Sequence, residues 1–268
     1  MADCIARNVI TSCHFLGSSS QGNCLLVKST TGNFLIDVGL TGRQIVTYLP
    51  TFGITIQDIG AIFVTHEHLD HSQGFRGLAK YTHFQCFANR ATAMAIDGKF
   101  EKLLPWKYFI TGEIIHYQGF EIETFSIPHD AIEPVGYIFR SCDGGKSLCW
   151  MTDLGYIPQN IRDRVKKSDI LVLEANYDNA MLENDEKRPP AIKNRIRGRY
   201  GHLSNESAFD LVAHASNADW QKIFLAHLSR DCNDSHRLEM LFGEDIFQKF
   251  DITVVDPHDA AGVSYSCL

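Results

Sequence analysis

The stretch from Ala61 to Gly74, which reads "AIFVTHEHLDHSQG", constrains the fold of this chain more than any other part of its sequence. It puts three histidines and two carboxylates in six consecutive positions, directly after a run of apolar residues that favour β-strands. Crowding so many imidazoles and carboxylates together costs solvation and causes charge repulsion unless something binds them. A divalent metal ion is therefore the expected binding partner.

The spacing inside this stretch favours two metal sites. His66 and His68 lie two positions apart, so their side chains project to the same side of an extended segment and can share one ion. Asp70 and His71 follow the point where the chain begins to turn, and adjacent residues point in different directions, which suits a second ion close by. The helical zinc motif H-E-x-x-H does not apply, because position 70 is an aspartate.

Three more candidate ligands lie far along the chain, each directly after an apolar run. His129 occurs in "SIPHDA", Asp153 in "WMTDLG" and His227 in "FLAHLS". Metal ions need more ligands than one short stretch supplies, and strand ends are where α/β sheets carry such side chains. A carboxylate can bridge two cations, which makes Asp153 the predicted bridge. The prediction is one ion held by His66, His68 and His129 and a second ion held by Asp70, His71 and His227.

Simpler alternatives exist for each of these residues. "HEHLDH" is also compatible with a polar surface loop, and the three distant residues taken singly are compatible with core or capping roles. The other histidines are treated as non-ligands, although His258, in "DPHDAAG", echoes "PHDA" and is the alternative ligand. Only the joint pattern favours the metal sites.

The patterns of strands and helices predict a four-layer αββα sandwich of the α/β (α+β) class. The expected strands are "NVITSCHFLG", "CLLVKS", "NFLIDVG", "AIFVT", "FEIETFSI", "VGYIFRS", "SLCWMTD", "DILVLEA", "KIFLAHLS" and "ITVVD". The expected helices are "TGRQIVTYLPTFGI" cut by Pro50, "SQGFRGLAKY" capped by Ser72, Ile157 to Lys166, Asn205 to His214 capped by Ser204, and Ser235 to Phe247. Two β-rich halves thus carry helices on their outer sides.

Length and composition indicate the number of domains, the state of the cysteines and the class of partner. Its 268 residues allow one large domain or two small ones, and the lack of a linker or repeat favours a single domain over residues 1–268. The eight cysteines form no C-x-x-C pair and several lie in apolar runs, which predicts buried, reduced thiols. No apolar run reaches the ~18 residues of a membrane span, so we expect a soluble, cytoplasmic protein without a membrane partner. The net charge of −7 argues against binding nucleic acid through bulk positive charge.

The pattern H-x-H-x-D-H, followed by a distant His, Asp and His, resembles the ligand signature of the metallo-β-lactamase superfamily. Segments such as "FLGSSSQGNC", "IPHDAIEPVGY", "LVLEANYDNAML" and "LAHLSRDCND" resemble the YycJ/WalJ group, which is similar to the tRNase Z branch and is associated with 5′-to-3′ DNA exonuclease activity. The resemblance runs from Phe15 to Asn233. It departs from the group at Asp231 and Cys232, where the usual pattern is "LS-x-E-N-N", which puts the geometry around the ligands in doubt.

The resemblance implies that a hydroxide bridging two metal ions attacks the phosphorus of a phosphodiester, without a covalent intermediate. It also implies a catalytic pair in addition to Asp70. Glu174, at the end of "DILVL", would orient His202 of "GHLSN", and His202 would contact the scissile phosphate or assist the leaving oxygen. A buried structural hydrogen bond between Glu174 and His202 is the alternative.

Several other residues are candidates for binding the substrate. Arg195 and Arg197 belong to "EKRPPAIKNRIRGRYGH", a basic segment that could meet a nucleic-acid backbone or form a solvated helix face. Ser19 and Asn23, in "GSSSQGN", could donate hydrogen bonds to phosphate, although a tight hairpin turn explains this segment equally well. The predicted substrate-binding set is completed by Ser204 and Asn233.

These features predict a metal-dependent phosphodiesterase, and more narrowly a 5′-to-3′ DNA exonuclease with DNA as its partner. Two divalent ions of zinc or manganese are expected per chain, and iron also suits such ligands. One alternative is hydrolysis of a small phosphodiester or a thioester, since the fold hosts many chemistries. Another is a non-catalytic scaffold that binds nucleic acid. The sequence does not predict the oligomeric state.

Overall fold

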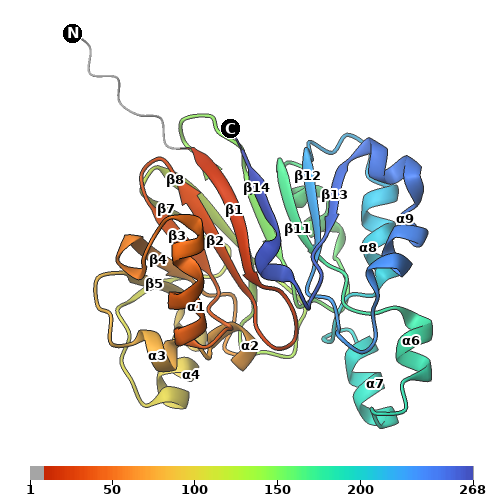
Figure 1. Ribbon diagram of the computed structural model, residues 1–268, viewed down its shortest axis with the longest axis horizontal. Helices are drawn as coiled ribbons and strands as arrows, with labels where there is room; N and C mark the ends of the chain where they lie inside the picture. The colour runs from red at the N-terminus through yellow and green to blue at the C-terminus, as the bar shows by residue number, and fades with distance from the viewer. Residues whose placement is uncertain (1–8, 268) are drawn as a thin grey trace.

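The computed structural model describes residues 9–267, and it confirms the predicted four layers (Figure 1). Two seven-stranded sheets pack face to face, with helices on the outer side of each sheet. Three apolar clusters separate the layers, one between the sheets and one between each sheet and its helices. Aromatic side chains fill the middle cluster, where the ring of Phe34 from one sheet stacks on Phe139 from the other at 5.0 Å.

The order of strands brings parallel strand ends to one edge of each sheet. The first sheet runs in the order β14 (Ser264–Ser266), β1 (Ile10–Gly17), β2 (Cys24–Ser29), β3 (Asn33–Ile36), β4 (Ile59–Phe63), β5 (Gln85–Asn89), β6 (Trp106–Phe109). The second runs β13 (Asp251–Val254), β12 (Lys222–Ala226), β11 (Ile170–Glu174), β10 (Leu148–Met151), β9 (Val135–Ser141), β8 (Phe120–Ser126), β7 (Ile114–Tyr117). Strands β3 to β6 are parallel to one another, and so are β10 to β13. Their carboxyl ends are where such folds carry functional side chains.

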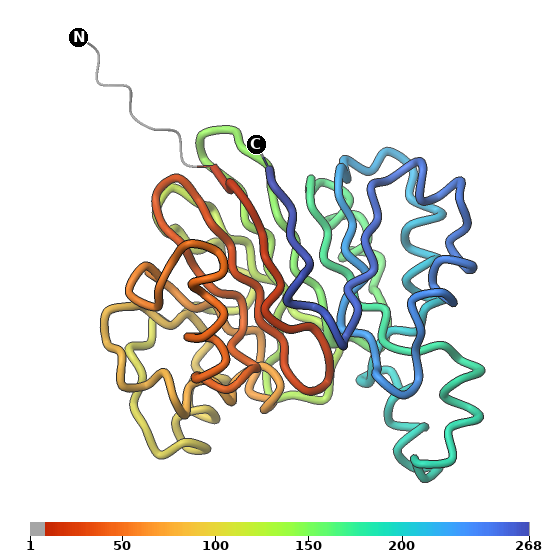
Figure 2. Tube along the Cα trace, viewed as in Figure 1, coloured from red at the N-terminus to blue at the C-terminus, as the bar shows by residue number. Residues whose placement is uncertain are grey.

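The helices fall into three sets. The first sheet is covered by α1 (Gly42–Tyr48), α2 (Leu69–Ser72), α3 (Phe75–Leu78) and α4 (Arg90–Phe100). The second sheet is covered by α5 (Gln159–Val165), α8 (Asn205–Ala213) and α9 (Ser235–Lys249). The remaining pair, α6 (Asn179–Asn184) and α7 (Pro190–Arg197), extends beyond the layers at the lower right of Figure 2. Short 3₁₀ turns occur at Leu49–Phe52, Ile56–Asp58 and Ala260–Gly262.

The local predictions hold for two helix ends and are wrong for a third. Helix α1 ends just before Pro50, and the hydroxyl of Ser204 caps α8 by accepting from the Ser207 amide at 3.2 Å. Ser72, however, does not cap a helix but is the last residue of α2. The helix cannot continue there, because Asp70 O accepts from the Asn23 amide and the Gly74 amide donates to Val38 O. Helices α4 and α6 are absent from the sequence-based prediction, whereas α7 lies in the basic segment for which a solvated helix face is one of the alternatives.

Two predictions from composition can be compared with the described residues. All seven cysteines within residues 9–267 are free thiols, and five are buried, whereas Cys142 is exposed and Cys267 is partly exposed. Cys4 lies outside the described residues. None of the helices formed by residues 9–267 has both the length and the apolar character needed to cross a membrane.

Candidate metal centre

The seven residues that the sequence selects as ligands meet where strand ends from both sheets come together. They follow β4, lie in α2, or follow β8, β10 and β12. Their ligand atoms form two groups, and within each group all these atoms lie within 4.8 Å of one another. We call these the three-histidine group (His66, His68 and His129) and the aspartate-rich group (Asp70, His71, Asp153 and His227).

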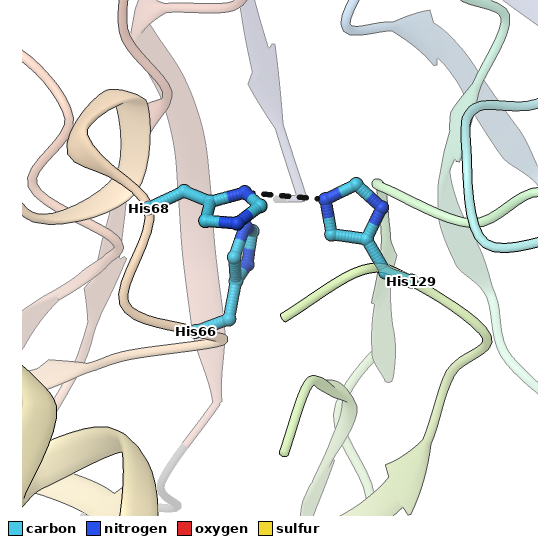
Figure 3. Close-up of side chains that lie close together, drawn as sticks. All are labelled: His66, His68 and His129. Carbon is cyan, nitrogen blue, oxygen red and sulfur yellow. Dashed lines mark hydrogen bonds between the residues drawn. The ribbon is translucent and has the colours of Figure 1, made fainter. Parts of the chain in front are cut away.

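In the three-histidine group, rings from two distant segments come together (Figure 3). Nδ1 of His68 and Nε2 of His129 are 3.3 Å apart. Ligand atoms that bind one tetrahedral ion at about 2.0–2.1 Å lie roughly 3.3 Å apart, so this spacing suits a shared ion. Burial lowers the pKa of His66 well below its ordinary value, and the nearby His71 adds to the effect. His66 is therefore neutral and offers a nitrogen lone pair.

Asp153 spans the two groups. Its Oδ2 lies 3.0 Å from Nε2 of His71, and its Oδ1 lies 3.8 Å from Nε2 of His129. On the other side of the aspartate-rich group, Oδ2 of Asp70 lies 3.6 Å from Nε2 of His227. A carboxylate with one oxygen toward each group has the arrangement that suits a bridge between two cations.

The charges of the aspartate-rich group favour a cation. Burial alone would lower the pKa of His227, but the charge of Asp153, the nearby carboxylate of Asp70 and the hydrogen bond to Glu174 raise it to about 10. Burial alone would raise the pKa of Asp153, but His227 and His71 outweigh it and hold that pKa well below its ordinary value. Where carboxylates hold a buried imidazole in its charged form, a divalent cation can replace the proton.

Asp37, which the sequence analysis does not select, orients His71. Nδ1 of His71 donates to Oδ2 of Asp37 at 2.7 Å, so Nε2 is the nitrogen left to face the group. Asp37 follows β3, is fully buried, and accepts from the amide and the hydroxyl of Thr65 at 2.8 and 3.1 Å. Its φ of 57° is uncommon for a residue with a side chain and persists because these bonds hold it. The available signal was an acidic residue directly after the apolar run "NFLI".

Glu174 contacts both His202 and a residue of the aspartate-rich group. Its Oε1 accepts from Nδ1 of His202 at 2.8 Å and from Nδ1 of His227 at 2.7 Å. Its Oε2 accepts from the amides of Leu154 and Leu203 at 2.9 and 3.0 Å. Burial raises the pKa of Glu174, but the charges and hydrogen bonds of the two histidines outweigh it and lower that pKa. The carboxylate is thus ionised, fixed in place and shared by two imidazoles.

Four of the seven proposed ligands, His68, Asp70, His129 and Asp153, line a cavity of about 230 Å³. Helix α7 forms one wall of it with Ile192, Arg195 and Ile196. The remaining lining residues are Ser20, Asp130, Gly201 and His202. A substrate that entered this cavity would therefore meet both groups and the His202 imidazole.

The residues present fit a divalent metal ion. Nε2 of His66 and Nε2 of His227 are buried and have no hydrogen-bond partner within residues 9–267. Orphaned buried nitrogens of this kind cost free energy unless a ligand satisfies them. Imidazole nitrogens and carboxylate oxygens are the donors that zinc, manganese and iron accept. None of the other histidines in that range joins either group, His258 included.

Comparison with known proteins decides the family. The Beta-lactamase superfamily domain matches residues 32–227. The chain belongs to this superfamily. Exodeoxyribonuclease YycJ of Bacillus anthracis is 31% identical over an alignment of 263 residues that covers 94% of this chain and 98% of that protein. Exodeoxyribonuclease WalJ of Streptococcus pneumoniae serotype 2 (strain D39) is 32% identical over an alignment of 223 residues that covers 81% of each protein.

A solved structure of the superfamily has the same fold. The short form of human tRNase Z is 16% identical and superposes with a TM-score of 0.67, covering 96% of this chain and 99% of that one. The expected kinship with YycJ/WalJ proteins and the predicted fold are confirmed. As a member of the superfamily with clustered His and Asp donors, this chain is a metal-dependent hydrolase that acts on ester bonds.

The two predicted arginine contacts differ in position. Arg195 lines the cavity, where its Nε donates to Oδ2 of Asp130 at 2.5 Å. The guanidinium of Arg197 pairs with Glu183 instead, and Arg197 does not line the cavity. Of these two arginines, Arg195 is the one placed to contact a substrate in the cavity.

Two further members of the predicted substrate-binding set have structural partners. Ser204 is buried and caps α8. The side-chain amide of Asn233 exchanges two hydrogen bonds with that of Asn205, at 2.8 and 2.9 Å, and donates to Ala175 O. That Ser204 and Asn233 bind substrate stays a prediction: neither lines the cavity, and both side chains hold the ends of strands and helices together. Sequence patterns cannot separate these uses of polar side chains.

Ser19 and Asn23 lie on the loop beside the metal centre. Nδ2 of Asn23 donates to Ser19 O and lies 3.0 Å from Nε2 of His71, so Asn23 braces the aspartate-rich group. Ser19 is buried and lines a neighbouring cavity rather than this one. The tight turn that the sequence allows as an alternative is thus present, with a Gly22 amide bond to Ser19 O.

The departures at Asp231 and Cys232 lie away from both groups. Asp231 accepts from Lys187 at 2.6 Å and from Arg188 at 3.0 Å. Cys232 is buried, and its Sγ lies 3.6 Å from Oδ2 of Asp185. These residues therefore attach the segment before α7 to the loop that follows β12.

Proposed function

We propose that this chain is a dinuclear metal-dependent phosphodiesterase that acts on DNA as a 5′-to-3′ exonuclease. One observation carries the proposal: a single oxygen of Glu174 contacts both His227 of the aspartate-rich group and His202 in the cavity. This contact couples a metal centre to a second side chain that can reach the substrate. Both relatives are named exodeoxyribonucleases, which supports DNA as the substrate.

The balance of charge supports two ions rather than one. Four carboxylates lie at the site: Asp37, Asp70, Asp153 and Glu174. With neutral imidazoles they carry four negative charges in surroundings that are largely buried, where uncompensated charge is costly. Two divalent cations balance that charge. Zinc and manganese are the proposed ions, and iron suits the same donors.

Two such ions, held by the three-histidine and aspartate-rich groups, would lower the pKa of a bound water molecule and neutralise charge on the phosphoryl oxygens. The chain's own residues do the rest. Asp70 lines the cavity, so its partly exposed carboxylate can orient the attacking water. Glu174 accepts a hydrogen bond from Nδ1 of His202, which leaves Nε2 of His202 to contact the phosphate or the leaving oxygen. The amides of Leu154 and Leu203 keep Glu174 from turning away.

Single-stranded DNA labelled at either end tests the proposal. With manganese or zinc, the purified protein should release labelled mononucleotides from 5′-labelled DNA and progressively shorten 3′-labelled DNA. His202→Ala should abolish most of this release, and His214→Ala is the matched control, because His214 is exposed at the far end of α8. A folded, metal-loaded protein that leaves DNA intact contradicts the proposal, and release from the 3′ end contradicts its polarity alone.

Hydrolysis of a small phosphodiester or a thioester is the second candidate. The size of the cavity, about 230 Å³ behind the wall of α7, favours it. Arg195→Ala separates the two functions, because a guanidinium on the cavity wall can pair with the phosphates of a nucleic-acid backbone. DNA cleavage should weaken and become less sensitive to salt, whereas turnover of a small ester should be unchanged.

A further inference from the structure

A second cavity, of about 260 Å³, lies across the β1–β2 loop from the metal centre. Ser20 at the tip of this loop lines the metal-centre cavity, whereas its neighbours Ser19 and Gln21 line the second cavity. One turn of backbone therefore separates the two. We call the second one the Arg230 cavity, after the guanidinium that contributes to its lining.

The loop between the two cavities is fastened to the metal centre. The hydroxyl of Ser18 accepts from the amide of His227 at 2.8 Å. The amide of Asn23 donates to Asp70 O at 2.7 Å. Both ends of the loop are thus bonded to residues of the aspartate-rich group. The distance between the two cavities is set by the same contacts that hold the proposed ligands.

The chemistry of the Arg230 cavity suits a nucleotide. Arg230 offers a cationic guanidinium, Gln44 an amide, and His258 an imidazole, while Tyr48 and Leu40 offer apolar surface to a base or a sugar. Arginine recognises phosphate with several parallel hydrogen bonds. One carboxylate, that of Asp259, also lines the cavity.

Arg230 differs from three of the arginines of the basic segment in how its charge is used. Arg188, Arg195 and Arg197 are each paired with carboxylates. The guanidinium of Arg230 donates only to neutral acceptors, the side chain of Gln21 and Pro257 O. Within residues 9–267 no carboxylate forms an ion pair with it, so its charge is available to a phosphate.

We propose that the Arg230 cavity binds a neighbouring nucleotide of the strand whose scissile phosphate lies at the metal centre. This inference rests on the proposed function, and it adds a second point at which the enzyme holds its DNA. A strand that crosses the β1–β2 loop passes from one cavity to the other, with a phosphate against Arg230. A substrate with a single phosphodiester and no neighbouring nucleotide gains nothing from this cavity.

Binding and cleavage by Arg230→Ala test the inference. The probe for binding is a fluorescent, phosphorothioate-linked single strand of DNA, which resists cleavage, and the probe for chemistry alone is bis(p-nitrophenyl) phosphate. The variant should bind the strand about tenfold more weakly, as expected for loss of one charge-assisted contact. The slope of log affinity against log salt should become flatter by about 0.7. Turnover of the small ester should be unchanged.

Two further variants make the result specific. Arg164→Ala removes the same charge from α5, where Arg164 pairs with Glu123 and lines neither cavity, and it should bind like the unmodified protein. Arg230→Lys keeps the charge and should recover most of the affinity. An Arg230→Ala variant with unchanged affinity and salt slope overturns the inference, and so does an equal loss of small-ester turnover, which would mean a disturbed metal centre.

The outcomes also separate this inference from the proposed function. Binding that depends on Arg230, in a protein that cleaves no DNA with any metal, supports the second cavity and contradicts the exonuclease. Cleavage of DNA with binding that does not depend on Arg230 supports the exonuclease and overturns the second cavity. A protein that neither binds nor cleaves DNA overturns both.

Discussion

The two groups of the metal centre are built from similar residues but are oriented in different ways. In the three-histidine group two imidazoles bond through Nδ1 to neutral partners: Nδ1 of His66 lies 3.0 Å from the hydroxyl of Thr65, and Nδ1 of His129 donates to Gly201 O at 3.0 Å. In the aspartate-rich group His71 and His227 each bond to a buried carboxylate, at 2.7 Å in both cases.

Because of this difference, we expect the two sites to bind their ions with different affinities. When one imidazole nitrogen donates a hydrogen bond to a carboxylate, the other nitrogen becomes a more basic ligand for a metal ion. The aspartate-rich group also contains two carboxylates of its own, Asp70 and Asp153. We therefore expect it to hold its ion more tightly than the three-histidine group, which is the site to lose an ion first.

The largest effect is expected from Asp153→Ala, because Asp153 contacts both groups. Without the proposed bridging carboxylate each proposed ion site would lose a ligand, so both ions should be lost and DNA cleavage should fall by about a thousandfold or more. Elemental analysis and the rate of cleavage measure the two losses. A variant that keeps two ions would show that the two groups bind their ions independently and that Asp153 does not serve both of them.

His202→Ala should have the next largest effect, and it should leave both groups intact. His202 shares Glu174 with His227 but belongs to the cavity wall rather than to the proposed ligand set. Its loss should lower kcat by about a hundredfold or more while the metal content stays at that of the unmodified protein. Loss of an ion in this variant would mean that His202 is part of the aspartate-rich site instead.

Asp37→Asn tests the comparison between the groups directly. Removing the negative charge behind His71 should weaken one ion site by about 10–100-fold and leave the other unchanged. His68→Ala is the matched change in the three-histidine group. In a titration with a chelator, the two variants should weaken different ions. If both variants weaken the same ion, the two groups are one coupled site.

That the proposed ligands would lie together could be predicted from the sequence, because every segment that carries them has a local signal. An apolar run followed at once by His or Asp predicts a side chain at the carboxyl end of a strand, and such ends meet at one edge. The same signal was present at Asp37, after "NFLI", but nothing local distinguishes a residue that would bind a metal from one that orients a ligand. That distinction depends on which nitrogen of His71 faces Asp37.

The contacts of the candidate substrate-binding residues were harder to predict, because their partners are distant in sequence. Glu183 and Asp130 neutralise two arginines of the basic segment, and no local pattern identifies these pairs. Asn233 is a residue type that often contacts substrates, but here its side-chain amide forms two hydrogen bonds with that of Asn205. Arg230 shows the opposite case. Its neighbours in sequence give no sign of a binding role, yet among the described residues its guanidinium forms no ion pair with a carboxylate.

The smallest effect is expected from Arg197→Ala, which removes a charge outside both groups. Arg197 pairs with Glu183, whose side chain is 66% exposed, and an exposed ion pair contributes little to stability. We expect the free energy of unfolding to change by less than about 0.5 kcal/mol and DNA cleavage by less than about twofold. Arg195→Ala, on the same helix but in the cavity, is the comparison. Equal losses from both changes would mean that α7 presents its whole basic face to DNA, and that the activity depends on that surface as well as on the two groups.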